Sequence, residues 1–107
     1  MERAYKDWRT TTQEKEVEQY LNKRVKNDLR GLSLKFVSPG FNGVPDRIIL
    51  IPGGRVYFVE TKAPGKTMRK LQKWVCGQIE SLGFAVLTID TKQKADVFVK
   101  EVCEGGI

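Results

Sequence analysis

Histidine is absent from this chain of 107 residues, and cysteine occurs only twice. The lack of histidine excludes histidine-ligated zinc and every catalytic triad in which histidine is the base. Cys76 and Cys103 do not have the spacing of metal ligands, and we interpret them as free thiols in a reducing compartment. Any metal ion must therefore be bound by oxygen atoms, which favours Mg²⁺ or Mn²⁺.

Long apolar segments are missing as well. The longest apolar run, residues 48–51, is far too short to cross a bilayer. Residues 1–7 contain no apolar stretch of the kind that signal peptides have, so we expect a cytoplasmic protein. The sequence has no repeat and no low-complexity segment, and residues 1–107 are expected to form a single domain with a core over about 11–103.

Positive charge is in excess. The 19 lysines and arginines against 13 aspartates and glutamates give a formal net charge of +6. On a small chain this excess suggests a polyanionic partner such as nucleic acid. Solubility alone would explain it equally well, so charge does not decide between these interpretations.

Periodicity and turn residues predict the order α-β-β-β-α-β-α. Helices are expected over 11–28, with Thr11 or Thr12 as N-cap, over 67–82, with Thr67 as N-cap, and from Asp90 or Thr91 to 103. Strands are expected over 34–38, 46–51, 55–62 and 84–89.

The connections between these strands predict how they pair. A tight turn at 52–54 makes the two middle strands an antiparallel hairpin, and the helix before the last strand makes a parallel crossover. The expected fold class is therefore α/β, with a mixed four-stranded sheet flanked by helices. Because both hairpin strands are nearly continuous in apolar residues, we expect them to be central and covered on both faces.

Charged residues stand at the ends of the two hairpin strands. Asp46 follows the turn-forming residues 43–45, and Glu60 and Lys62 share a face near the end of the returning strand. The hairpin brings the acids to one end of the sheet, where they cost free energy unless they are paired or bind a metal. A salt-bridged strand end that faces water is the plain alternative.

In the functional interpretation, Asp46 and Glu60 are direct ligands of Mg²⁺ and the carbonyl of Thr61 is a third. A metal-activated water would attack a phosphodiester. Lys62 would orient that water or neutralise charge in the transition state.

The first expected helix offers a further carboxylate. Glu14 lies in the middle of its inward face and would bind the metal through water, whereas Glu18 lies at the edge of that face and is the alternative. A first-turn glutamate that only favours the helix dipole is the plain interpretation.

These residues resemble the PD-(D/E)xK nuclease superfamily, and most closely its VRR-NUC domain. The resemblance rests on Gly43-Val44-Pro45-Asp46 and Phe58-Val59-Glu60-Thr61-Lys62, is supported by residues 14–18, 35–40 and 71–72, and spans about 14–86. It implies a restriction-endonuclease-like core and a Mg²⁺-dependent nuclease centre formed by Glu14, Asp46, Glu60, Lys62 and Gln72. Thr61 departs from the family, in which an apolar residue is more usual.

The resemblance also implies a homodimer related to Holliday-junction resolvases, acting on branched DNA such as four-way junctions. The role of Gln72 comes from the resemblance alone, because the sequence pattern makes it a half-exposed helix residue.

Basic and hydroxyl side chains around this centre are candidates for contacts to DNA phosphates. They are Lys35, Ser38, Arg47, Lys66, Arg69, Lys70 and Lys73. The last four cluster at the start of the second expected helix, where the helix N-terminus also favours phosphate. An ordinary solvated face is the alternative for each of them, and Trp74 is open to interpretation as core, dimer contact or stacking platform.

The expected activity is that of a Mg²⁺- or Mn²⁺-dependent endodeoxyribonuclease. The main alternative is a non-catalytic nucleic-acid-binding module on the same fold, which would not need the metal. A sequence-specific duplex nuclease and a structural or interaction protein are further alternatives.

Overall fold

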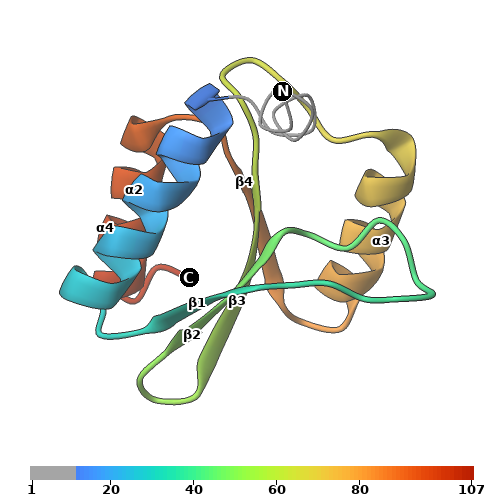
Figure 1. Cartoon of the computed structure of the whole chain (residues 1–107). Coiled ribbons are helices and arrows are strands. Elements are labelled where there is room, and N and C mark those ends of the chain that lie inside the picture. The colour runs from blue at the N-terminus through green and yellow to red at the C-terminus, as the bar shows by residue number, and fades with distance from the viewer. Residues whose placement is uncertain (1–11) are drawn as a thin grey trace.

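The computed structural model describes residues 12–107 (Figure 1). Its elements are α2 (Thr12–Asp28), β1 (Leu32–Lys35), β2 (Arg47–Ile51), β3 (Arg55–Thr61), α3 (Lys70–Ser81), β4 (Ala85–Ile89) and α4 (Lys92–Cys103). This is the α-β-β-β-α-β-α order expected from the sequence. Thr11, one of the two expected N-caps of the first helix, lies outside the described residues.

The four strands form one sheet in the order β1-β2-β3-β4. The pairs β1–β2 and β2–β3 are antiparallel, whereas β3 and β4 are parallel. The turn between β2 and β3 is built on Gly53 and Gly54, whose φ angles of 94° and 77° are costly for any other residue. The mixed sheet and the central hairpin are therefore confirmed.

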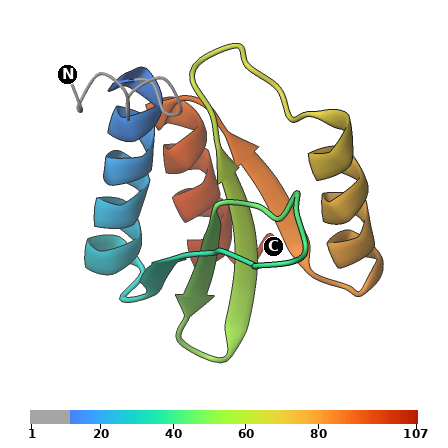
Figure 2. The ribbon, with the colours of Figure 1, turned by 45° about the vertical axis from the view of Figure 1, so that its right-hand side comes forward.

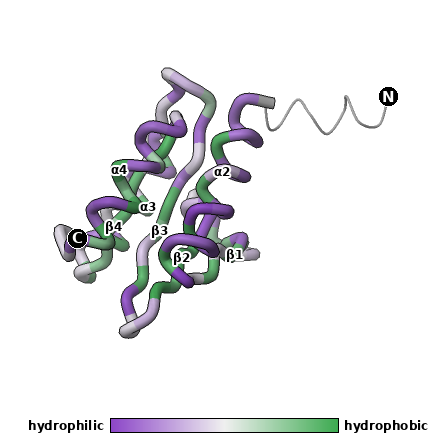
Figure 3. The backbone as a smooth tube through the Cα atoms, turned by 90° about the vertical axis from the view of Figure 1, so that its left-hand side faces the viewer, coloured by the Kyte–Doolittle hydropathy of each residue, from purple (hydrophilic) through white to green (hydrophobic). Residues whose placement is uncertain are grey.

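One face of the sheet carries the hydrophobic core. Helices α2 and α4 lie side by side on this face, and α3 lies on the opposite side (Figures 1 and 2). Leu21 of α2, Ile49 of β2 and Phe98 of α4 are at most 1% exposed. The ring of Tyr57 meets Phe98 edge-on, with centroids 5.5 Å apart. In Figure 3 the helices carry long hydrophilic stretches, while hydrophobic segments gather along the strands.

The opposite face of the sheet is only partly covered, because α3 packs mainly against β4, and Ile48, Leu50 and Phe58 of the hairpin are only half-buried. The expectation that both hairpin strands are covered on both faces is therefore wrong for this side. Apolar side chains of β1, β2 and β3 and of the residues beside them remain accessible here. We call this surface the open sheet face, and it consists of Leu32, Leu34, Phe36, Ile48, Leu50, Phe58 and Phe84.

Two element boundaries differ from the sequence expectation. β1 begins at Leu32 and ends at Lys35, so the segment expected to be a strand up to Ser38 leaves the sheet early. Helix α3 begins at Lys70 after the N-cap Arg69, and Thr67 does not cap it. In the connection before α3 the amide of Gly65 donates to Asp90 at 3.0 Å, and the helix begins only five residues later.

The start of α4 resolves an alternative that the sequence left open. Thr91 is the N-cap, and its hydroxyl oxygen accepts a hydrogen bond from the amide of Lys94 at 3.1 Å. None of the helices formed by residues 12–107 is long and apolar enough to cross a membrane.

Candidate active site

A cavity of about 520 Å³ opens at the end of the β2–β3 hairpin, between α2 and α3. We call it the acid pocket. It is lined by Glu14, Asn42, Gly43, Asp46, Glu60, Lys62, Arg69, Leu71 and Gln72. The five side chains expected to form the nuclease centre, which come from α2, β3, α3 and the segments beside β2 and β3, therefore face one space.

Asp46 and Glu60 are held against each other by the hairpin. The amide of Asp46 donates to Oε1 of Glu60 at 3.1 Å. In return, Oδ2 of Asp46 accepts hydrogen bonds from the hydroxyl of Thr61 at 3.1 Å and from its amide at 3.4 Å. These reciprocal bonds fix two carboxylates of neighbouring strands in a single orientation.

Lys62 completes this arrangement from the same face of the sheet as Glu60. Its ammonium lies 2.8 Å from Oε2 of Glu60. The Glu60 side chain is only 3% exposed and that of Lys62 only 19%, so the ion pair is largely removed from water. Such an ion pair stabilises the folded state only when its geometry is good, because both charges have lost their hydration.

Two carboxyl groups of the acid pocket have pKa values raised above their ordinary range. Burial, followed by the neighbouring carboxylate of Glu60, raises the pKa of Asp46 above its ordinary value. Burial, followed by the charge of Asp46, likewise raises the pKa of Glu14. Both shifts mean that a positive charge placed among these carboxylates would be favoured.

The structure distinguishes between the two candidate glutamates of α2. Glu14 lines the acid pocket and senses the charges of Asp46, Lys62 and Glu60. Oε2 of Glu18 instead accepts from Nη1 of Arg47 at 3.0 Å. Glu14 is therefore the α2 carboxylate that faces the cluster.

Gln72 supplies an oxygen atom that needs a partner. It lies in the first turn of α3, and its Oε1 is buried without a hydrogen bond to any other described residue. A buried amide oxygen left in this state costs about 1–3 kcal/mol unless a water or ligand satisfies it. Because Gln72 lines the acid pocket, that partner would have to come from the pocket.

The donor set fits a hard divalent cation. Between residues 12 and 107, no three histidine, cysteine, aspartate or glutamate side chains converge closely enough to hold an ion by themselves. The two fixed carboxylates of Asp46 and Glu60 match a cation that takes few protein ligands and keeps several waters, as Mg²⁺ does, and the unsatisfied oxygen of Gln72 can accept a hydrogen bond from such a water.

Comparison with known proteins points in the same direction. The chain is 36% identical over 84 residues to "Putative nuclease p44" of Acyrthosiphon pisum secondary endosymbiont phage 1, an alignment that covers 78% of this chain and 89% of that protein. A solved structure of a "VRR_NUC domain" superposes with a TM-score of 0.78 at 25% identity, over 84% of this chain and 97% of that one. No family profile matches.

The chain belongs to the VRR-NUC family. The fold expected from the resemblance is confirmed: the mixed sheet and the order of elements agree with the VRR-NUC structure. The hairpin and the crossover helix of this VRR-NUC fold are the elements that carry the acid pocket.

The residues expected to contact DNA lie in different surroundings in this VRR-NUC chain. Arg69 lines the acid pocket, Lys66 and Lys73 line a neighbouring cavity, and Lys35 and Lys70 are exposed. Ser38 is half-buried in the segment after β1.

Arg47, unlike these exposed lysines, is held by other residues of the protein. Its guanidinium is bound to Glu18 and also donates to the hydroxyl and the carbonyl oxygen of Ser33, at 3.1 and 3.0 Å. The Arg47 side chain is only 12% exposed. It therefore joins α2 to β1, and nothing in its placement supports a contact to DNA.

The sequence analysis did not place Asn42 and Gly43 in the acid pocket, and it considered Asp90 only as an N-cap, not as a buried carboxylate. Asn42 and Gly43 line the acid pocket from the loop before β2, and the density of turn-forming residues there was the available signal. Asp90 is 8% exposed, and the Lys94 ammonium beside it holds the pKa of its carboxyl below its usual range. Its position directly after an apolar strand was the only hint that it is buried.

Proposed function

We propose that this VRR-NUC protein is a Mg²⁺- or Mn²⁺-dependent endonuclease that hydrolyses DNA phosphodiester bonds inside the cell, in a bacterial or phage context. Its family is one of nucleases, and the relative from the phage carries that description in its name. The observation that carries the proposal is the convergence of Glu14, Asp46, Glu60, Lys62 and Gln72 on one cavity.

The carboxylates of Asp46 and Glu60 are the groups that would hold the cation, with the carbonyl of Thr61 as a further ligand and Glu14 acting through water. Their fixed orientation and the raised pKa of Asp46 support this assignment. When bound, such an ion acidifies a water molecule and stabilises negative charge on the phosphate.

Lys62 and Gln72 act on the reacting atoms. The Lys62 ammonium, held by Glu60, stabilises the charge that builds up on the phosphate oxygens as water adds to phosphorus and the bond to the leaving oxygen breaks. The unsatisfied oxygen of Gln72 accepts a hydrogen bond from the attacking water and thereby orients it.

The preferred substrate in this proposal is branched DNA such as a four-way junction, cut by a homodimer. The open sheet face supports the dimer, because Leu32, Leu34 and Phe84 of this face are 60%, 44% and 42% exposed. Exposed apolar side chains gathered on one face of a sheet favour an interface. Two copies would bring two acid pockets to one branched substrate.

The proposal is tested by cleavage of labelled four-way junction, duplex and single-stranded DNA in Mg²⁺, in Mn²⁺ and in EDTA. We expect cleavage only with a divalent ion, and a loss of at least about 100-fold in Glu60→Gln. Glu16→Gln is the matched control, since Glu16 is an exposed carboxylate of α2 near Glu14 and should cleave like the wild type.

The results separate the proposal from its main alternative. Binding of DNA without cleavage under every metal condition would mean a nucleic-acid-binding module. Cleavage of duplex as fast as of the junction would retain the nuclease and remove the branched-DNA preference.

A further inference from the structure

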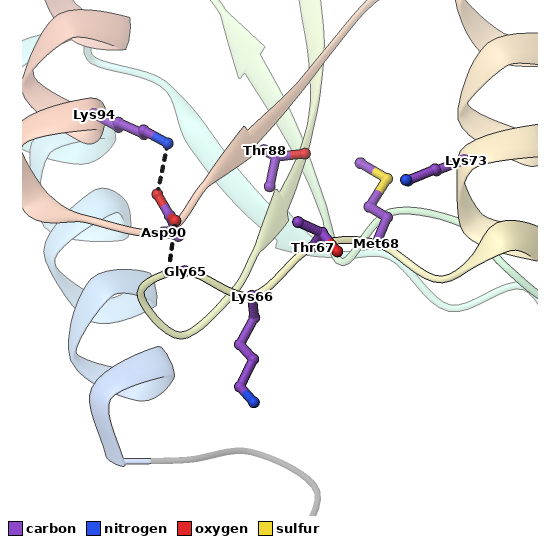
Figure 4. A pocket seen from close by; sticks show the side chains of 8 residues that line it. All are labelled: Gly65, Lys66, Thr67, Met68, Lys73, Thr88, Asp90 and Lys94. Atoms are coloured by element: carbon purple, nitrogen blue, oxygen red, sulfur yellow. Dashed lines mark hydrogen bonds and ion pairs between the residues drawn. The ribbon is translucent and has the colours of Figure 1, made fainter.

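A second cavity, of about 460 Å³, lies on the other side of the connection between β3 and α3. We call it the loop cavity. It is lined by Gly65, Lys66, Thr67, Met68, Lys73, Thr88, Asp90 and Lys94 (Figure 4). The segment 62–73 therefore forms a wall of both cavities, because Lys62, Arg69 and Gln72 face the acid pocket.

The loop cavity carries a net positive charge. Three of its lining side chains are lysines and one is an aspartate. The carboxylate of Asp90 is already engaged, since it accepts from the amide of Gly65 at 3.0 Å and lies 2.9 Å from the ammonium of Lys94. The ammonium groups of Lys66 and Lys73, in contrast, form no ion pair with any described residue.

Hydrogen-bond donors complete the lining. The hydroxyls of Thr67 and Thr88 make no hydrogen bond within residues 12–107. Figure 4 shows that Lys73 directs its ammonium towards Met68 and the connecting segment, while Lys66 extends away from that space. Lys73, Thr67 and Thr88 thus offer donors from the lining of the cavity that are unpaired among the described residues.

The start of α3 adds to the positive field. The helix has no side-chain cap and no acidic residue in its first turn, yet Arg69, Lys70 and Lys73 are gathered there. Positive charges at a helix N-terminus are unfavourable by roughly 0.3–1 kcal/mol each, and the first amides of a helix have no partner within it. An anion bound beside them removes both costs.

We propose that the loop cavity binds a backbone phosphate of the DNA strand that enters the acid pocket, with Lys73, Thr67 and Thr88 as its donors. The inference rests on the proposed function for the identity of the ligand as nucleic acid. The shared wall formed by 62–73 gives the reason: a strand held in the acid pocket crosses this segment and carries its neighbouring phosphates into the positive cavity. Asp90 and Lys94 keep the wall in place.

The test measures binding in an Asp46→Asn background, so that cleavage does not interfere. Anisotropy of labelled four-way junction DNA is followed over a series of salt concentrations. Lys73→Ala should weaken binding about fivefold or more and lower the salt slope by roughly 0.7–0.9, the value for one lost phosphate contact. Lys100→Ala is the control, because this exposed lysine of α4 removes the same charge away from the cavity.

Thr88→Val distinguishes a phosphate bound in the loop cavity from one bound only at the N-terminus of α3. It leaves the net charge unchanged, and we expect it to weaken binding about threefold or more, since it removes a hydroxyl donor to a charged oxygen. An effect of Lys73→Ala without any effect of Thr88→Val would place the phosphate outside the cavity and overturn the proposal. Equal effects of Lys73→Ala and Lys100→Ala would overturn it as well.

Two further results distinguish the ligand and the underlying function. Inorganic phosphate at constant ionic strength should compete only weakly with DNA; loss of DNA binding at low millimolar phosphate, absent in Lys73→Ala, would mean a site for free phosphate. If the wild type binds DNA through the cavity but never cleaves it, the nuclease proposal fails and the phosphate site stands.

Discussion

At the scale of single residues, Glu60 and Lys62 form a largely buried ion pair, and in the proposed mechanism both also take part in the chemistry. The sequence predicts that Asp46, Glu60 and Lys62 lie at one end of the sheet, because strand periodicity and one tight turn determine their positions. The structure brings them together. The sequence could not predict that Arg47 binds other residues of the protein, since its partners Glu18 and Ser33 come from distant segments.

Removal of the Lys62 ammonium should destabilise the protein, because the buried carboxylate of Glu60 then has no cation beside it. Lys62→Met leaves Glu60, which is 3% exposed, without its cation. We expect a loss of about 2 kcal/mol in the free energy of unfolding, below the 3–5 kcal/mol of fully enclosed pairs because the pocket is open. Urea denaturation without metal measures it. The double variant Glu60→Gln/Lys62→Met should recover most of the loss, and a double variant as unstable as the single one would refute this account.

The raised pKa of Asp46 predicts a pH-dependent effect on stability. The contribution of the protonated carboxyl is fully present below its ordinary pKa of 3.8 and is lost as pH rises through the higher pKa of the folded state. Asp46→Asn should therefore have a higher Tm than the wild type at pH 7 in EDTA, because the amide removes the carboxylate that burial and Glu60 disfavour. The difference in Tm between the variant and the wild type should become smaller as pH falls.

Divalent metal supplies the control for this prediction. Excess Mg²⁺ should raise the Tm of the wild type, because a ligand that binds only the folded state stabilises that state. The Tm of Asp46→Asn should stay nearly unchanged, because this variant lacks one of the proposed metal ligands. A Tm of the variant below that of the wild type in EDTA at pH 7 would contradict the assigned cause of the shift.

At the scale of elements, the loop before β2 and the helix α3 depend on each other for their positions. Gly43 has a φ of 93°, and a Cβ there would lie 3.0 Å from side-chain atoms of both Leu71 and Val75. Helix α3 can therefore approach this loop only because residue 43 has no side chain. The same contact positions Gln72 over the acid pocket.

Gly43→Ala should push α3 away from the hairpin. Gly40→Ala is a matched control, because Gly40 has a similar φ of 82° but open space around its Cβ position. Both substitutions carry the backbone cost of a positive φ, so the difference between them reports the contact with α3 alone. We expect Gly43→Ala to be less stable than Gly40→Ala by about 1–2 kcal/mol in urea denaturation, and to cleave more slowly. Equal stabilities would show that α3 adjusts without cost.

The boundaries of α3 and β1 could not be predicted from local sequence patterns. Thr67 has the properties of an N-cap, but α3 begins only at Lys70, after a connection in which Gly65 is hydrogen-bonded to Asp90. That bond joins residues that are 25 apart in sequence, so no local pattern reports it. Helix α4, whose cap Thr91 bonds within three residues, could be predicted from the sequence.

At the scale of the whole molecule, the sequence predicts the order of elements, the mixed sheet and the central hairpin. It misjudges the coverage of the sheet, because continuous apolar strands indicate burial without indicating what buries them. Helices α2 and α4 cover one face, and α3 leaves much of the other accessible. A second copy of the chain would supply the missing layer.

A charge on the open sheet face should therefore change the oligomeric state. Phe84 is 42% exposed and its ring packs edge-on against Phe58 at 5.6 Å, so Phe84→Lys places an ammonium in the surface that the dimer would bury. We expect the wild type to sediment as a dimer at micromolar concentration and Phe84→Lys to dissociate at least about tenfold more readily, since an unpaired buried charge costs several kcal/mol. Val97→Lys is the control, because Val97 is 54% exposed on α4 on the other side of the sheet. A dimer that survives Phe84→Lys but dissociates in Val97→Lys would move the interface to the helical face, and a monomeric wild type would remove the two-site model of junction cleavage.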